Sequence, residues 1–219
     1  MSKPRMVRRF SAVVRVSHWL YALSFITLAV TGYMIYGSAL DWMIPLFGSL
    51  EGAMVVHRVA AVFLIMAVLI PILMRPREVT AWLGEVFTFT EADIAFLKTF
   101  PAKFVGVKKK IPPQGFYNGG EKINSLIQII SGVVMITTGL FMWLSSSPPP
   151  IMYPLHALFM AIGSASAIGH IYLALLNPIS NEAIRAMING DVSEKYMQEN
   201  HGQWYQEVYK AAPKGKRSN

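Results

Sequence analysis

The amino-acid sequence predicts an all-α membrane protein: a four-transmembrane-helix bundle with both termini cytoplasmic, plus short interfacial and C-terminal helices. Composition is the first reason, because 53% of the 219 residues are hydrophobic and 15% are charged, whereas soluble domains average about 25% charged residues. The second reason is that long stretches of the chain lack charge altogether. The third is the uneven distribution of the cations, which predicts the orientation.

The first two spans are predicted between charged segments. The first covers residues 16–37, inside a stretch without Asp, Glu, Lys or Arg that continues to residue 40. At about 1.5 Å per residue this stretch exceeds the roughly 30 Å hydrocarbon core of a bilayer. The second span covers residues 52–74 and contains one charge, Arg58, near its start.

The last two spans come from one charge-free stretch between Lys122 and Glu182. Its Ser-Ser-Ser-Pro-Pro-Pro run at 145–150 divides it into spans over 123–144 and 151–177. We therefore expect a transmembrane domain over 1–177, with a cytoplasmic loop at 75–122, and a helical cytoplasmic tail over 178–219.

The orientation follows from the connecting segments. They place 19 of the 20 Lys and Arg residues before the first span, between the second and third, or after the fourth. The positive-inside rule puts these segments and both termini in the cytoplasm. Within the middle segment, Thr90 and Asp93 resemble a helix capping box, which predicts a short helix on the membrane surface that Pro101 should limit.

Charge and cysteine content exclude several functions. The formal charge of +8 could suggest a nucleic-acid partner, but such proteins gather their cations on a soluble domain. With no cysteine in the chain, disulfides, thiolate metal ligation, a cysteine nucleophile and c-type haem attachment are excluded. A metal or cofactor must be held by other side chains.

Four histidines occur at two membrane depths. His18 and His170 lie near the cytoplasmic ends of the first and fourth spans, and His57 and His156 lie near the opposite ends of the second and fourth. The 14 residues from His156 to His170 correspond to about 21 Å of helix and return to nearly the same face. Two histidines across a helix bundle suit the axial positions of a b-type haem, so the spacing predicts two haems. His201 fits neither pair and is expected to be a surface or packing residue.

Small residues recur at seven-residue intervals in the last two spans. They are Ser125, Gly132 and Gly139 in the third and Gly163, midway between the histidines, in the fourth. Their faces would let porphyrin planes approach the backbone. The alternative is that they only allow close helix packing, which is common in membranes.

Two haems at opposite membrane depths predict electron transfer between a donor on one face and an acceptor on the other. A lipid-soluble quinone is the natural acceptor, beside the cytoplasmic haem and His170. The candidate pocket is the segment 115–122, where glycines including Gly120 permit a tight turn, Asn118 can hydrogen-bond, and Glu121 or Lys122 could serve a proton path. The alternative is a plain glycine-rich turn leading into a helix.

These motifs resemble the gamma, or cytochrome b, subunit of membrane-bound formate dehydrogenases. The similarity covers nearly the whole chain and includes Ser17-His18-Trp19, His57-Arg58, the run Tyr117-Asn-Gly-Gly-Glu-Lys122, His156, His170, the run Met187-Ile-Asn-Gly-Asp-Val-Ser193, and His201 with Trp204 and Tyr205. The tail pattern is the most discriminating part, because paired histidines also suit the cytochrome b subunits of hydrogenases and thiosulfate reductases.

The resemblance implies a cofactor arrangement and partners. His57 and His156 would hold a periplasmic-side haem, and His18 and His170 a cytoplasmic-side haem beside which menaquinone is reduced. The partners would be a periplasmic molybdenum or tungsten catalytic subunit and an iron–sulfur subunit, in a bacterial inner membrane. Formate oxidation itself would take place on another subunit. The family's loop commonly has glutamine where this chain has Glu121. Either side chain can accept a hydrogen bond through its oxygen, but only glutamate can carry a proton, so the resemblance does not assign Glu121 a role in proton transfer.

Other functions remain possible from the sequence. The chain could instead serve an uptake hydrogenase or another molybdoenzyme. A proton-coupled transporter using a histidine relay is an alternative of another class, although broken helices and acidic residues at mid-membrane, which it would favour, are not predicted. Arg58, the only cation near the outer surface, is a candidate partner for a haem propionate.

Overall fold

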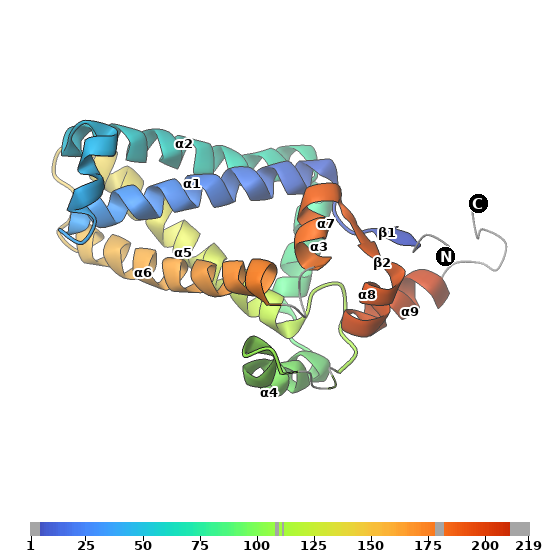
Figure 1. The fold of residues 1–219 in the computed structure, drawn as a ribbon. Helices are drawn as coiled ribbons and strands as arrows, with labels where there is room; N and C mark the ends of the chain where they lie inside the picture. The colour runs from blue at the N-terminus through green and yellow to red at the C-terminus, as the bar shows by residue number, and fades with distance from the viewer. Residues whose placement is uncertain (1–4, 108–109, 111, 178–181, 211–219) are drawn as a thin grey trace. The chain divides into compact units, whose positions relative to one another are not determined.

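The computed structural model describes residues 5–107, 110, 112–177 and 182–210 (Figure 1). As the fold class predicts, the described part of the chain consists mainly of helices. In chain order the elements are β1 (Met6–Arg8), α1 (Ala12–Tyr36), the 3-10 helix η1 (Asp41–Phe47), α2 (Leu50–Met74), α3 (Pro76–Phe87), α4 (Glu91–Phe104), α5 (Gly119–Leu144), α6 (Met152–Ile171), the π-helical turn η2 (Tyr172–Leu176), α7 (Glu182–Asn189), β2 (Asp191–Ser193), α8 (Glu194–Asn200) and α9 (Gly202–Lys210).

Within the described residues, four helices are long and apolar enough to cross a membrane: α1, α2, α5, and α6 continued by η2. They agree with the four predicted spans. Three of them begin earlier than expected, α1 at Ala12, α2 at Leu50 and α5 at Gly119. The reason is that a charged residue marks the edge of the hydrocarbon region, whereas helical hydrogen bonding can continue past it into the polar interface.

The chain divides into two compact units. The bundle unit comprises Ala12–Thr80 and Ile127–Ile168, which includes α1, α2 and most of α5 and α6. The loop unit comprises Met1–Ser11, Ala81–Leu126 and Gly169–Asn219, which includes β1, α4, α7, β2, α8 and α9.

In the bundle unit, small and polar residues let the helices approach closely. Helices α1 and α2 pack side by side along their lengths (Figure 1). A Cβ atom added at Gly163 of α6 would lie 3.3 Å from Phe25 and 3.4 Å from Ser131. Gln128 of α5 donates a hydrogen bond of 3.0 Å to the Gly163 carbonyl. Gly163 therefore serves close helix packing, the alternative that the sequence left open.

In the loop unit, β1 and β2 form an antiparallel ribbon with Met6 opposite Ser193. Gly190 begins the ribbon with a φ of 93°, and a Cβ there would lie 2.7 Å from the Arg8 guanidinium. The sequence does not predict this ribbon, because strands of three residues are too short to show an alternating pattern. The helices of the predicted tail are present, and residues 178–181 and 211–219 of that tail lie outside the described residues.

The segment between α2 and α5 is more helical than predicted. Helix α3 is an addition to the expected elements. The capping box at α4 is confirmed: Thr90 N–H donates to Asp93 Oδ2 at 2.8 Å, and Asp93 N–H donates to Thr90 Oγ1 at 3.3 Å. The expectation that Pro101 limits this helix is wrong, because α4 continues to Phe104. Pro101 lies in the last turn of α4. It cannot donate a backbone hydrogen bond there, but the helix continues for only three more residues.

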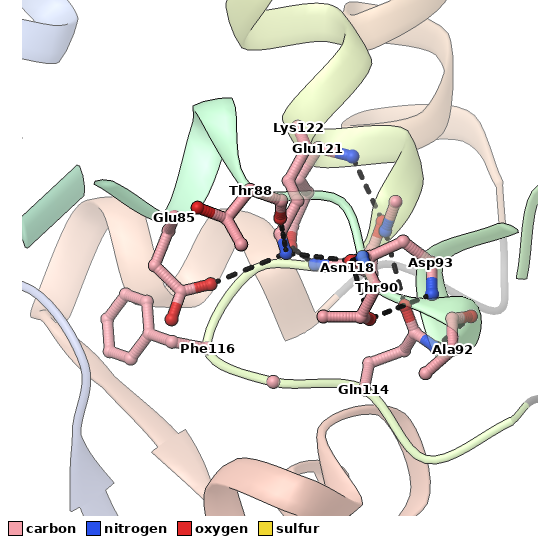
Figure 2. Close-up of polar contacts among 12 residues, drawn as sticks. Glu85, Thr88, Thr90, Ala92, Asp93, Gln114, Phe116, Asn118, Glu121 and Lys122 are labelled. Atoms are coloured by element: carbon pink, nitrogen blue, oxygen red, sulfur yellow. Dashed lines mark hydrogen bonds and ion pairs between the residues drawn. The ribbon is translucent and has the colours of Figure 1, made fainter. Parts of the chain in front are cut away.

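The start of α5 is attached to α4 by a buried ion pair (Figure 2). The ammonium of Lys122 lies 2.9 Å from Asp93 Oδ2 and 3.0 Å from the Thr88 carbonyl oxygen. The side chains of Lys122 and Asp93 are 5% and 3% exposed. The more exposed Glu85 adds a second carboxylate at 3.5 Å from the ammonium. Lys122 therefore joins three points of the loop unit.

The charge of Asp93 is favoured by these contacts. Burial by itself raises the pKa of a carboxyl group, but the hydrogen bond from Lys122 and the two from Thr90 outweigh burial, so the pKa of Asp93 is lowered below its ordinary value. The folded state thus binds a proton at Asp93 less readily than the unfolded chain. The pair stabilises the fold above the unfolded pKa, and its contribution is lost as pH falls through the folded pKa.

Replacing Lys122 with Met should lower the free energy of unfolding by about 3–5 kcal/mol, because Asp93 would keep a buried charge without its counter-ion. Equilibrium unfolding of the full chain in mixed micelles measures this loss. Lys195→Met is the matched control, since it breaks an exposed pair with Glu199 and should change stability little. Equal losses in the two variants would contradict a structural role for the buried pair.

The same pair predicts a pH dependence. The stability difference between the unmodified chain and Asp93→Asn should be constant from about pH 8 to 5 and should shrink as pH falls below about 4, where Asp93 itself becomes protonated. Unfolding in the same micelles at a series of pH values gives the curve. A difference that grows on acidification would mean that the pKa of Asp93 is raised.

Candidate haem site and interfacial loop

The bundle unit brings His57 and His156 together. His57 lies in the second turn of α2, whose start is capped by Ser49 Oγ accepting from the Gly52 N–H at 3.0 Å. His156 lies near the start of α6. Their ring centroids are 6.4 Å apart, with 58° between the ring planes. This is the pair predicted for the outer depth.

Each of the two rings is held at Nδ1 by a buried threonine. Thr31 Oγ1 of α1 lies 2.8 Å from His57 Nδ1, and Thr138 Oγ1 of α5 lies 2.8 Å from His156 Nδ1. Each hydroxyl also lies 2.7 Å from the carbonyl oxygen four residues earlier in its own helix. With the hydroxyl proton on that carbonyl, which can only accept, the threonine oxygen accepts the Nδ1–H of the histidine. In this tautomer Nε2 of each ring carries the lone pair.

A glycine follows each of these threonines. A Cβ at Gly139 would lie 3.3 Å from His156 Cε1, closer than most such contacts, so this glycine leaves space for the imidazole ring beside the helix backbone. A Cβ at Gly32 would be in ordinary contact with His57 Cε1 at 3.5 Å and in tighter contact with Met160 Sδ at 3.1 Å. Sequence reasoning missed the threonines, although the Thr-Gly dipeptide shared by the first and third spans was a visible signal.

This arrangement fits a b-type haem. The two imidazole rings face one helix bundle with centroids 6.4 Å apart, and together they would hold the haem iron. With both Nδ1 atoms hydrogen-bonded to the protein, Nε2 of each ring is the available ligand.

The other two histidines predicted to bind haem lie in different units of the chain. His18 lies on α1 in the bundle unit, and His170 lies at the end of α6 in the loop unit. Their pairing stays a prediction from the sequence. Arg58 is exposed, and its guanidinium carbon lies 5.6 Å from the ring centroid of Trp143. Its contact with a propionate also stays a prediction.

The loop before α5 is ordered by a second reciprocal cap. Asn118 N–H donates to Glu121 Oε2 at 2.9 Å, and Glu121 N–H donates to Asn118 Oδ1 at 3.0 Å. A Cβ at Gly119 would lie 2.7 Å from the Asp93 carbonyl oxygen, and one at Gly120 would lie 3.2 Å from Phe100. Glycine is required at 119 because α5 begins against the backbone of α4, and Gly120 packs closely against the side chain of Phe100. The loop is therefore a packed structure as well as a turn.

A buried arginine supports the same loop. Arg9, whose side chain is 1% exposed, donates to the Phe116 carbonyl at 2.7 Å and lies 3.1 Å from Glu121 Oε1. The Phe116 and Trp204 rings lie 5.4 and 6.0 Å from its guanidinium. Burial alone would lower the pKa of Arg9, but the Glu121 carboxylate more than offsets it, and the pKa is raised. Sequence reasoning treated Arg9 as one of many cytoplasmic cations.

The C-terminal tail forms the other side of the loop. His201 is fully buried, and its Nδ1 lies 2.9 Å from the Gly115 carbonyl oxygen. The backbone carbonyl of Gln114 accepts a hydrogen bond of 2.9 Å from the Gln203 N–H. The side-chain nitrogen of Gln114 donates to the Ala92 carbonyl at 3.0 Å. Of the two roles expected for His201, packing is the one observed. Gln114, also fully buried, was missed because nothing local in the sequence marks its partners.

Relatives match this chain over nearly its whole length. The formate dehydrogenase cytochrome b556(fdo) subunit of Escherichia coli K12 is 24% identical over 98% of this chain and 99% of its own length. The nitrate-inducible formate dehydrogenase cytochrome b556(Fdn) subunit of the same strain is 24% identical over 98% and 97%. A formate dehydrogenase cytochrome b556 subunit of Haemophilus influenzae is 22% identical over 94% and 85%. These matches confirm the resemblance seen in the motifs.

A family model gives the broader classification. The model described as prokaryotic cytochrome b561 matches residues 9–190. This range covers most of the chain and contains Arg9, the histidines of the spans and the loop before α5. From these features and this match, the chain belongs to the prokaryotic cytochrome b561 family.

Proposed function

We propose that this chain is a dihaem b-type cytochrome subunit, which carries electrons across the bacterial inner membrane from an iron–sulfur subunit of a periplasmic formate dehydrogenase to a quinone near the cytoplasmic face. The observation that carries the proposal is the His57 and His156 pair, with ring centroids 6.4 Å apart and both Nδ1 atoms on threonines. Membership of a cytochrome b family supports b-type haem as the cofactor.

His57 and His156 would bind the first haem through Nε2, and His18 and His170 the second. A bound b-type haem accepts and releases one electron at a time. The distribution of the cations supports cytoplasmic termini, which would place the His57 and His156 site toward the periplasm. Arg58, on the turn of α2 that carries His57, would meet a propionate of that haem.

The quinone would bind at the loop of Asn118, Gly120 and Glu121, beside His170. Reduction of a quinone to its quinol takes two electrons, supplied by the partner subunit, and two protons from the cytoplasmic side. Because Asn118 Oδ1 already accepts the cap hydrogen bond, its amide nitrogen is the group that would donate to a quinone carbonyl. Glu121, held by Arg9 and by Asn118 N–H, would keep Asn118 in place.

The names of the relatives support the proposed partners. The matched proteins are named as cytochrome b subunits of formate dehydrogenases. By this similarity the chain would assemble with a molybdenum or tungsten catalytic subunit and an iron–sulfur subunit on the periplasmic side, and menaquinone would be its substrate. Formate would be oxidised on the catalytic subunit.

Replacing His57 with Ala should remove one of two haems and leave the other, because one axial ligand of the first site is lost. His156→Ala should give the same result, and His18→Ala should remove the other haem instead. Haem content and absorption spectra of the reduced, purified complex show which haem each variant has lost. Loss of neither haem in His57→Ala would refute the proposed ligation, and equal loss of both would refute the pairing.

Replacing Asn118 with Asp should slow quinone reduction about tenfold, because a hydrogen bond worth roughly 1–1.5 kcal/mol is lost while an oxygen remains to cap α5. Asn118→Ala, which removes the cap as well, serves as the comparison for structural damage. Formate-driven reduction of a soluble naphthoquinone by the whole complex measures the rate, with both haem spectra as the control for folding. Unchanged quinone kinetics in Asn118→Asp would place the substrate elsewhere.

A further inference from the structure

We propose that Thr31 and Thr138 are positioning residues for the haem at His57 and His156, each fixing the tautomer and direction of one axial imidazole from a neighbouring helix. This inference rests on the proposed function, since it takes both histidines as ligands. The inference goes beyond the proposed function because it gives a role to two residues that touch neither the iron nor a substrate. It also names an interaction that sets the midpoint potential of the haem.

The geometry on the two sides is nearly the same. Thr31 is fully buried and Thr138 is 4% exposed. Each oxygen lies 2.8 Å from a histidine Nδ1 and 2.7 Å from its own helix carbonyl four residues back. The hydroxyl proton goes to that carbonyl, so both histidines are donors at Nδ1. Each imidazole therefore presents an unprotonated Nε2 before any metal is bound.

The threonine and the glycine after it act together. The side chain of Thr138 reaches His156, and Gly139 leaves room beside the same ring, where a Cβ would approach Cε1 to 3.3 Å. Thr31 reaches His57 in the same way, and Gly32 lies beside that ring, where a Cβ would be 3.5 Å from Cε1. The site thus consists of two corresponding halves: α1 supports a ligand carried by α2, and α5 supports a ligand carried by α6.

The hydrogen bonds have a redox consequence. An imidazole that donates from Nδ1 is a more basic ligand at Nε2, and such outer contacts tune a bound metal. A more basic axial ligand stabilises ferric over ferrous haem and lowers the midpoint potential. Two equivalent threonines would act on both faces of the same haem, and removing either should raise its potential.

The simpler explanation is that threonines in membrane helices only satisfy their hydroxyls on their own backbone. Thr27, which is half-buried, shows that behaviour and donates to the Leu23 carbonyl at 2.9 Å. Thr137, beside Thr138 in the chain, is exposed. These two residues are matched controls on the same helices. Replacing either one removes a threonine hydroxyl for which the described structure shows no hydrogen bond to a histidine.

The test uses the whole complex with Thr31→Val, Thr138→Val and the double variant, against Thr27→Val and Thr137→Val. Redox titration followed by absorption should show an upward shift in the midpoint potential of one haem and no shift in the other. The affinity of that site for haem should fall about 10- to 100-fold. The electron paramagnetic resonance signal of its ferric form should change as the rings turn. Thr31→Ser and Thr138→Ser, which keep a hydroxyl, should restore all three properties.

The outcomes separate this inference from the function on which it rests. If Thr31→Val and Thr138→Val behave as Thr27→Val and Thr137→Val do, the positioning role is refuted even though His57→Ala still loses a haem. If His57→Ala keeps both haems, the ligation itself is wrong. The unshifted spectrum of the other haem shows in each preparation that the bundle has folded, and a threonine variant that disturbs both haems equally counts against the inference.

Discussion

A polar group in hydrocarbon must find its partner inside the protein, and the bundle unit is arranged around that constraint. Thr31 and Thr138 place their hydroxyl protons on their own helices and offer the remaining lone pair to His57 and His156. Gln128 satisfies a backbone carbonyl of α6 where Gly163 brings that helix close. The same interactions that make the histidines tolerable in the membrane leave Nε2 as the atom available for binding.

Buried charge organises the loop unit in a comparable way. Lys122 with Asp93 joins the start of α5 to α4, and Arg9 with Glu121 joins the N-terminal segment to the same helix start. These two pairs involve adjacent residues of α5, 121 and 122. The loop proposed to receive the quinone is therefore bounded by groups that would be costly to separate, which suits a site that must present Asn118 in one orientation.

The sequence was most informative where the signal was local. The spans follow from the absence of charge over about twenty residues, and the capping box of Thr90 and Asp93 involves residues three apart. The shared depth of His57 and His156 follows from helix rise alone. The partners of Arg9 are 107 and 112 residues away, and His201 is 86 residues away from the Gly115 carbonyl that it contacts. No pattern at one place in the chain carries that information, so these contacts were found only from the fold.

The tautomer of the two histidines bears on how such a protein is assembled. Metal binding usually releases protons, because ligands must be deprotonated first. Here the imidazole protons are already on Nδ1 and engaged with Thr31 and Thr138. By the proposed ligation, the helices can pack in the bilayer first. A haem that enters afterwards would break neither of these hydrogen bonds and would displace no proton into the apolar interior.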